Sequence, residues 1–473
     1  MESEKIFDVV IVGGGPAGLS VGAELAKKGH KVAVIEKGTA GTTYRSWIVP
    51  GYIIAKLDPE VQKYAYNGVN RFLEYTPDFE VEWDTVGPWD VAQKYKTYPF
   101  INQEGILGYW VDVIKKNGSE VFDNQIYIDL KYENDHVVVK SVSTSDGSDF
   151  SEYKGRLILD ASGYDSDLAK KERVNRDGYF WWSVYGFDIE FDDVTKLKHP
   201  GDLGNMKVGD FMLWNSFKNV PMQNDASLSQ LRPIMEYEVL DEKHVFVLIL
   251  YFFNDLVTKD YMKNSLNYLV QTEDTIASLK TGKIVKDRFG WYPSAAISQQ
   301  ISKDRMAFIG DAGCWTIPAG WGMSFILDNY AEYAERISKA LNENKLDKNT
   351  LNDAAKLNVR QKYEVLMDKV VLHFLSYAEP NIINKFTKII KDKFGGGMLE
   401  TMFCLQMTEE QAVETMIEIW KNFTWQDLRS VHLPKEDIWM IGEAAMYFGE
   451  SFINTMTRKL FGLKPERTGF EFK

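Results

Sequence analysis

The segment from Phe7 to Glu36 constrains this chain most strongly, because spaced glycines stand between two short apolar runs. The first run, Phe7 to Val12, leads into Gly13-x-Gly15-x-x-Gly18, and the second run ends at Glu36. In a strand–helix–strand unit, such glycines let the backbone approach a pyrophosphate at the helix N-terminus, and the acid accepts hydrogen bonds from a ribose. The alternative is an ordinary glycine-rich strand–helix turn. A dinucleotide site here would be lined by Gly13, Gly15, Ala17, Gly18, Glu36 and Lys37.

Composition limits the compartment and the partners. The 473 residues predict two or three lobes, and the net charge of −13 without a basic block argues against nucleic acid. Two distant cysteines and six scattered histidines offer neither a disulfide framework nor metal spacing, so we expect a reducing, cytoplasmic compartment and no metal. The nucleotide motif begins at once, which leaves no room for a signal peptide, and the longest apolar run, Val245 to Phe253, is too short to cross a bilayer. Contact with a membrane surface remains open, and so does the oligomeric state.

Two later segments repeat the pattern of an apolar run that stops at small and acidic residues. The first is Leu159-Asp160-Ala-Ser-Gly163. The second is Ile309-Gly310-Asp311, which precedes a loop and a helix predicted from about Met323 to Leu341. A flavin dinucleotide is long, so its two ends need binding segments far apart in the sequence. Taken alone, Gly310-Asp311 is equally consistent with a strand-end turn.

Together the three motifs resemble the glutathione-reductase-type flavoproteins, over residues 5–37, 155–168 and 305–330. The resemblance implies FAD as the cofactor, with the late Gly-Asp on its ribityl chain and flavin phosphate, and NAD(P)H as an external electron donor. Arg45 would pair with the pyrophosphate or remain a solvated loop arginine. Beyond the first motif, the resemblance implies that the cofactor is also bound by Arg45, Asp160, Gly163, Gly310, Asp311, Pro318, Gly320, Gly322 and Met323.

Hydrophobic periodicity predicts an α/β fold with a Rossmann-like FAD-binding domain, a mainly antiparallel β substrate domain and a helical C-terminal region. The predicted segments are residues 1–171 for the first part of the FAD-binding domain, 172–300 for the β domain, 301–345 for the return to the FAD-binding domain, and 346–473 for the helical region. Within the first segment, Gln103 to Lys116 has helical spacing.

The middle segment resembles the lycopene cyclases and geranylgeranyl reductases, whose relatives include flavin halogenases and aromatic hydroxylases. The resemblance rests on Val184–Glu190, Asp210–Trp214 and Arg288–Pro293. Lycopene cyclases carry two adjacent glutamates on a strand of this lobe, whereas the corresponding run here, Val245 to Leu250, contains no acid. Glu236, Glu238 and Asp255 lie nearby in sequence but off that position.

The resemblance implies an FAD-dependent oxidoreductase that acts on a hydrophobic substrate, an isoprenoid or other secondary metabolite, by reduction, dehydrogenation or oxygenation at carbon. Two alternatives stay open: a non-redox, lycopene-cyclase-like cyclase that uses reduced FAD, and a flavin- or lipid-binding protein without catalysis. Aromatic residues of the middle segment could line an apolar chamber or simply form its core. The weak candidates for catalysis are Tyr185, Trp214, Tyr251, Trp291 and Trp321; Trp321 would lie over the flavin or pack in its loop.

Overall fold

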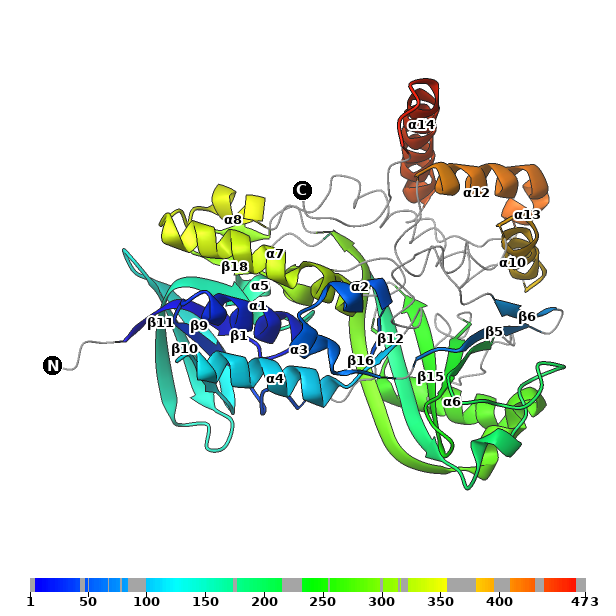
Figure 1. The fold of residues 1–473 in the computed structure, drawn as a ribbon, viewed down its shortest axis with the longest axis horizontal. Helices are drawn as coiled ribbons and strands as arrows, with labels where there is room; N and C mark the ends of the chain where they lie inside the picture. Colours follow the sequence, from blue (N-terminus) through cyan, green and yellow to red (C-terminus); the bar gives the residue numbers. More distant parts are fainter. Residues whose placement is uncertain are drawn as a thin grey trace.

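Two large sheets and a group of C-terminal helices form the molecule (Figure 1). The computed structural model describes residues 5–42, 47–49, 51–66, 68–76, 79–83, 99–172, 177–214, 232–253, 256–297, 301–313, 315, 322–354, 380–394, 409–429 and 438–464. Within these ranges the chain has the predicted α/β architecture: a Rossmann-like sheet, a largely antiparallel second sheet and a helical C-terminal region.

The first sheet, called the cofactor sheet below, has eight strands on the path β17-β18-β11-β1-β2-β8, with β10 and β9 branching from β11. The strands from β18 to β8 are parallel to their neighbours on this path, whereas β17, β10 and β9 pair antiparallel. The bounds are β1 (Ile6–Val12), β2 (Val32–Ile35), β8 (Glu120–Phe122), β9 (Gln125–Tyr132), β10 (Val137–Ser143), β11 (Phe150–Asp160), β17 (Ser302–Lys303) and β18 (Met306–Phe308).

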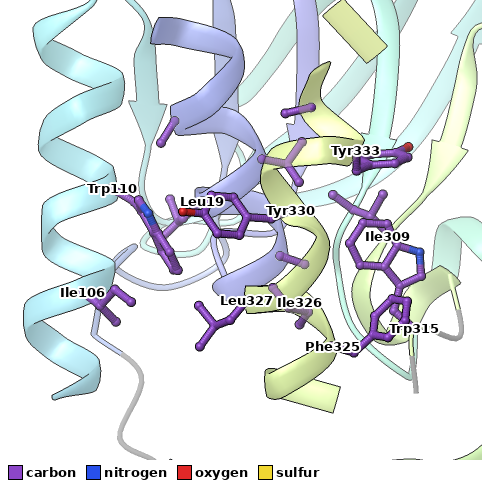
Figure 2. Packing of buried hydrophobic residues seen from close by; sticks show 14 of the residues in the cluster. Leu19, Ile106, Trp110, Ile309, Trp315, Phe325, Ile326, Leu327, Tyr330 and Tyr333 are labelled. Carbon is purple, nitrogen blue, oxygen red and sulfur yellow. The ribbon is translucent and has the colours of Figure 1, made fainter. Parts of the chain in front are cut away.

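Three helices cover one face of the cofactor sheet. α1 (Pro16–Lys27) lies between α4 (Gln103–Lys116) and α7 (Gly322–Asn342) and contacts both. Trp110 of α4 and Tyr330 of α7 meet at a ring-centroid distance of 5.7 Å, beside Leu19 of α1 (Figure 2). The predicted helix at Gln103 is confirmed, and Asn102 caps it by accepting a hydrogen bond from the Gly105 amide. The remaining helices of this half are α2 (Gly51–Lys56), α3 (Pro59–Gln62), α5 (Asp167–Lys171) and α8 (Lys348–Ala354).

The second sheet has seven strands in the order β16-β12-β15-β14-β13-β5-β6. All neighbours are antiparallel except β13 and β5, which are parallel. The bounds are β5 (Arg71–Thr76), β6 (Phe79–Trp83), β12 (Asp177–Glu190), β13 (Asp210–Trp214), β14 (Ile234–Val239), β15 (His244–Phe253) and β16 (Lys283–Ile297).

The two faces of the seven-stranded sheet enter different cores. One face, called the cofactor-side face, shares a hydrophobic cluster with α1, α4 and α7 of the cofactor half. The opposite face, called the back face, packs against α6 (Lys259–Thr272) and η4 (Asp274–Thr281). Because side chains alternate along a strand, residue parity decides which core each side chain joins. The cofactor-side face carries Trp182, Phe211, Phe246, Leu248, Leu250 and Phe252.

The sheets do not follow the predicted boundary between residues 171 and 172. β5 and β6 come from the first segment, yet they extend the second sheet beyond β13. A three-stranded sheet of β3 (Trp47–Ile48), β7 (Phe100–Ile101) and β4 (Ala65–Tyr66) comes from the same stretch. That stretch has no regular apolar period, so strand pairing across more than a hundred residues left no local signal.

The C-terminal helices lie on the same side of the molecule as β5 and β6 and project beyond the sheets (Figure 1). They are α10 (Pro380–Phe394), α12 (Glu409–Asn422), α13 (Trp425–Arg429) and α14 (Ile438–Leu460). α12 contacts both α10 and α14. Among the described helices, none is both long enough and apolar enough to cross a membrane.

Candidate functional site

Parallel pairing brings the three sequence motifs to one edge of the cofactor sheet. Val12 at the end of β1 pairs with Ile35 of β2 and with Asp160 of β11, and Asp160 in turn pairs with Phe308 of β18. The loops that follow these four strands therefore leave the same carboxyl edge. Open α/β sheets bind their ligands outside that edge.

The first loop has the shape that a pyrophosphate site requires. Gly13 has φ +110°, and a β carbon built on it would lie 2.4 Å from the Ala161 carbonyl oxygen. A β carbon on Gly18 would lie 2.1 Å from the Gly13 carbonyl oxygen, so only glycine lets α1 start this close to β1. At Gly15, by contrast, a β carbon would meet no atom within 4 Å, and no side chain caps α1 there. The helix N-terminus is thus open toward a ligand whose phosphates it would stabilise.

Glu36 shapes the same loop. Its Oε2 accepts a 2.7 Å hydrogen bond from the Gly14 amide, and its Oε1 accepts a 2.9 Å bond from the Gly38 amide. These bonds leave one lone pair on each oxygen for the hydroxyls of a ribose. Lys37 is exposed beside it, and Ala17 is buried.

Asp160 is a positioning residue in this structure. Its side chain is fully buried, and its Oδ1 accepts hydrogen bonds from the Ser162 amide (3.0 Å) and the Ser162 hydroxyl (2.6 Å). Ser166 donates to Oδ2 and also caps α5. The carboxylate therefore fixes the turn after β11 through these hydrogen bonds. Gly163 in that turn has φ +91° and open space at its β position.

The third motif packs directly on the first. Gly310 has φ +60°, and a β carbon on it would lie 2.8 Å from the Ala17 β carbon. Asp311 lies within η5 (Gly310–Gly313), and its Oδ1 would lie 3.7 Å from a β carbon on Gly322, the first residue of α7. Met323 is partly buried against the main core. The motifs thus meet as one site, whose loops would hold the two halves of a flavin dinucleotide.

Four expected cofactor or catalytic residues, Arg45, Pro318, Gly320 and Trp321, lie outside the described residues.

The comparisons with known proteins agree with this geometry. Residues 8–105 match the family model described as FAD dependent oxidoreductase. The matched segment contains the glycine-rich turn after β1, α1 and Glu36. FAD is therefore the cofactor of this chain, and the chain is an enzyme of this broad type.

Similar proteins of known sequence and structure include carotenoid enzymes and flavoproteins. The capsanthin/capsorubin synthase of Capsicum annuum is 26% identical over 210 residues, which are 43% of this chain and 36% of that protein. The curated relatives are matched over only 10–36% of their own length.

Two solved structures share the fold over most of the chain. A geranylgeranyl bacteriochlorophyll reductase-like protein from Thermoplasma acidophilum has a TM-score of 0.67 and 15% identity, covering 89% of this chain and all of its own. The halogenase PltM, in complex with phloroglucinol and FAD, has a TM-score of 0.60 and 13% identity, covering 95% of this chain and 96% of its own.

The sheet separates three of the expected catalytic aromatic residues from the cofactor half. Tyr185, Trp214 and Tyr251 are buried in the back-face core under α6. Burial raises the pKa of Tyr185 and of Tyr251, which keeps both hydroxyls protonated. Trp291 donates a 2.8 Å hydrogen bond to the Val257 carbonyl, beside the start of α6. Strand parity thus places Tyr185, Trp214 and Tyr251 in the core away from the cofactor edge. Trp291, by contrast, also contacts the ring of Tyr164, the residue after Gly163, with ring centroids 6.1 Å apart.

The structure instead points two acidic side chains from β14 onto the cofactor-side face. Glu236 pairs with Leu248 and Glu238 with Phe246, and side chains of directly paired residues share a face. Glu236 therefore lies beside the strand whose sequence contains no acid. The missed signal was the spacing itself, because acids two residues apart in a strand share one face.

Proposed function

We propose that this enzyme transfers hydrogen to or from carbon of a large apolar substrate, an isoprenoid or related secondary metabolite. The observation that carries the proposal is the cofactor-side face. Its central strand, β15, offers an unbroken apolar row to the cluster that also contains Ile309 and Phe325 of the cofactor half. A substrate held between FAD and this row would contact hydrocarbon and aromatic side chains almost entirely.

The aromatic side chains on this face give it a defined shape. Phe72 stacks on Phe211 with ring centroids 4.8 Å apart, and Trp182 packs on Phe252 at 5.4 Å. Rings locked in this way form a rigid wall, which favours a substrate with conjugated or repeated double bonds. The names of the geranylgeranyl and carotenoid relatives support the same substrate class.

In the proposed reaction, bound FAD supplies or accepts hydride. The α1 N-terminus and Glu36 would hold its adenine half, and Asp311 and the start of α7 would hold its flavin half. The apolar wall would orient the substrate and exclude water, so that hydride is not lost to solvent.

The test uses purified holoenzyme under anaerobic conditions, with NADPH or NADH as reductant and geranylgeraniol as the apolar probe. We expect the reduced nicotinamide to bleach the flavin absorbance and the probe to gain two hydrogens per turnover, read by mass spectrometry. Flavin reduction without any product from geranylgeraniol would contradict the proposed substrate class.

The paired acids favour a second candidate, the non-redox cyclase. A cyclase would return a product isomeric with its substrate and consume no reduced nicotinamide. The same assay, run with a linear carotenoid such as lycopene, therefore separates the two functions.

A further inference from the structure

Glu236 and Glu238 lie on the cofactor-side face, which also carries Asp188 and Arg288. Their intervening residue, Tyr237, is fully buried on the back face, where its hydroxyl lies 2.8 Å from His199 Nδ1. The back-face contact fixes the register of β14, so both glutamates must point toward the cofactor side. Glu238 is only 4% exposed.

Arg288 lies close enough to Glu238 to lower the pKa of that carboxyl, but another acid already holds its guanidinium. Arg288 donates a 2.7 Å hydrogen bond to Asp188 Oδ2, and its guanidinium lies 4.7 Å from the Phe246 ring centroid. Glu238 Oε2 has no hydrogen-bond partner among the described residues. A buried carboxyl oxygen without a partner is unfavourable when ionised, and such groups call for an explanation.

Further titratable groups near the pair, among the described residues, are a phenol and two acids. Tyr66 of β4 and Asp241 after β14 act on this region electrostatically, and Glu74 of β5 lies on the same face, level with Glu236 across β13. Within the described ranges, no group of three or more His, Cys, Asp or Glu is arranged to hold a metal ion.

Burial makes the pair retain protons at neutral pH. It raises the pKa of Glu236 to about 7 and, together with repulsion from Glu236 and Asp188, that of Glu238 to about 8. At pH 7, Glu238 therefore holds its proton more firmly than Glu236 does.

We infer that Glu236 and Glu238 form the proton-donating site of the proposed reaction, acting on a carbon–carbon double bond of the apolar substrate. The inference rests on the proposed function. The carboxyl O–H bond breaks, and the π electron pair of the double bond forms one new C–H bond. Reduced FAD, when bound, would supply the hydride for the second C–H bond and would be oxidised to FAD, and water would reprotonate the carboxylate.

The first test needs no substrate. Infrared difference spectra of holoenzyme labelled with ¹³C-glutamate, compared with Glu238→Gln and Glu236→Gln, report the C=O stretch of a protonated carboxyl. We expect this band in the wild type at pH 7 and a weaker band in Glu238→Gln, where Glu236 alone contributes to it. If both carboxyls are ionised at pH 7, the inference is overturned.

The second test follows the proton. Reduced holoenzyme acting on geranylgeraniol in D₂O should place solvent deuterium in each saturated bond, and the rate of saturation reports the contribution of the proton donor. Glu238→Gln should slow saturation about 100-fold, while FAD content and reduction by NADPH stay unchanged, and Glu238→Asp should restore part of the rate. The matched control is Glu332→Gln, at an exposed site on α7. Saturation at the wild-type rate in Glu238→Gln and in the double glutamine variant would refute proton donation.

The two proposals fail separately. If wild-type holoenzyme binds FAD but leaves geranylgeraniol unchanged, the proposed substrate class fails. The infrared experiment then still tests whether the acid pair is protonated, because it needs no substrate.

Discussion

Gly310 and Ala17 meet where the last parallel strand of the cofactor sheet reaches the first helix. A β carbon on Gly310 would lie 2.8 Å from the Ala17 β carbon, and Gly310 adopts φ +60°. The two residues are 293 positions apart in sequence. Their contact joins the loop that would hold the pyrophosphate to the loop that would hold the flavin half.

We therefore predict that Gly310→Ala weakens FAD binding at least about 10-fold, because the new methyl group must push the flavin loop away from α1. Gly147→Ala is the matched control. Gly147 has a similar φ of +65° but open space at its β position, so it bears the same backbone strain without the clash. Fluorescence titration of apoprotein with FAD measures both variants, and equal losses of affinity would contradict the packing argument.

The raised pKa of Glu238 predicts how stability depends on pH. A carboxyl whose pKa is higher in the folded chain than in the unfolded chain favours folding most below its unfolded pKa of about 4.3. That contribution is lost as pH rises through its folded pKa of about 8. We expect Glu238→Gln, which never ionises, to be more stable than the wild type by about 1–3 kcal/mol near pH 9. The advantage should vanish near pH 5.

Urea unfolding of both proteins at the two pH values measures this difference, with Glu332→Gln as the surface control. A Glu238→Gln variant that is equally destabilised at both pH values would show that the ionised carboxylate is stabilised by partners.

Asp210 is also a buried acid, but its pKa is shifted downward, so we predict the opposite dependence of stability on pH. Burial alone would raise its pKa, but hydrogen bonds from His199, Arg71 and the Lys207 amide outweigh burial and lower it. We expect Asp210→Asn to reduce the free energy of unfolding at pH 7 by about 3–5 kcal/mol, because Arg71 and His199 lose the negative charge and one of the two acceptor oxygens that they share. The wild-type advantage should shrink only in acid, as pH falls through the lowered pKa of Asp210.

Denaturant unfolding at pH 7 tests this, and the exposed Lys140–Glu152 pair supplies the contrast. Glu152→Gln should change stability by less than about 1 kcal/mol. Equal effects of the two substitutions would argue against a stabilising role for the buried network.

The end of α14 predicts binding to an anionic lipid surface. Met446, Ile453 and Leu460 are 66–81% exposed along one stripe of the helix. The stretch 451–464 contains three basic residues and no acid, although Lys459 also pairs with Glu410. An amphipathic helix with an apolar stripe and basic flanks partitions into the lipid–water interface.

Flotation with anionic phosphatidylglycerol vesicles should capture the wild type, and the double variant Ile453→Asp, Leu460→Asp should stay unbound. Vesicles of phosphatidylcholine alone should bind less. If the wild type binds neither kind of vesicle and sediments as a dimer, and the double variant sediments as a monomer, then a second copy of the chain covers the stripe instead.

The sequence predicts the cofactor edge well because each of its motifs is local. Gly13, Gly15 and Gly18 are required by one turn, and the strands on either side are read from short apolar runs. The loop after β18 could likewise be expected, since Gly310 and Asp311 follow a buried strand.

The substrate side could not be predicted in the same way because it depends on pairing and parity. A shift of one residue moves every side chain of a strand to the other face. Tyr185 and Tyr251 look like chamber residues in sequence, but their strands turn them into the core under α6. The place of Glu236 on the cofactor-side face can be recognised only once β14 is paired with β15, which puts Glu236 next to Leu248.

The central claim is that the loops after β1, β11 and β18 bind one FAD. Native mass spectrometry of the gently purified and FAD-reconstituted protein tests it most directly. The account predicts one FAD per chain, released on denaturation and lost from a Gly13→Val variant that blocks the turn against Ala161. A wild-type protein that retains no FAD after reconstitution, or a Gly13→Val variant that binds it equally well, would contradict the account.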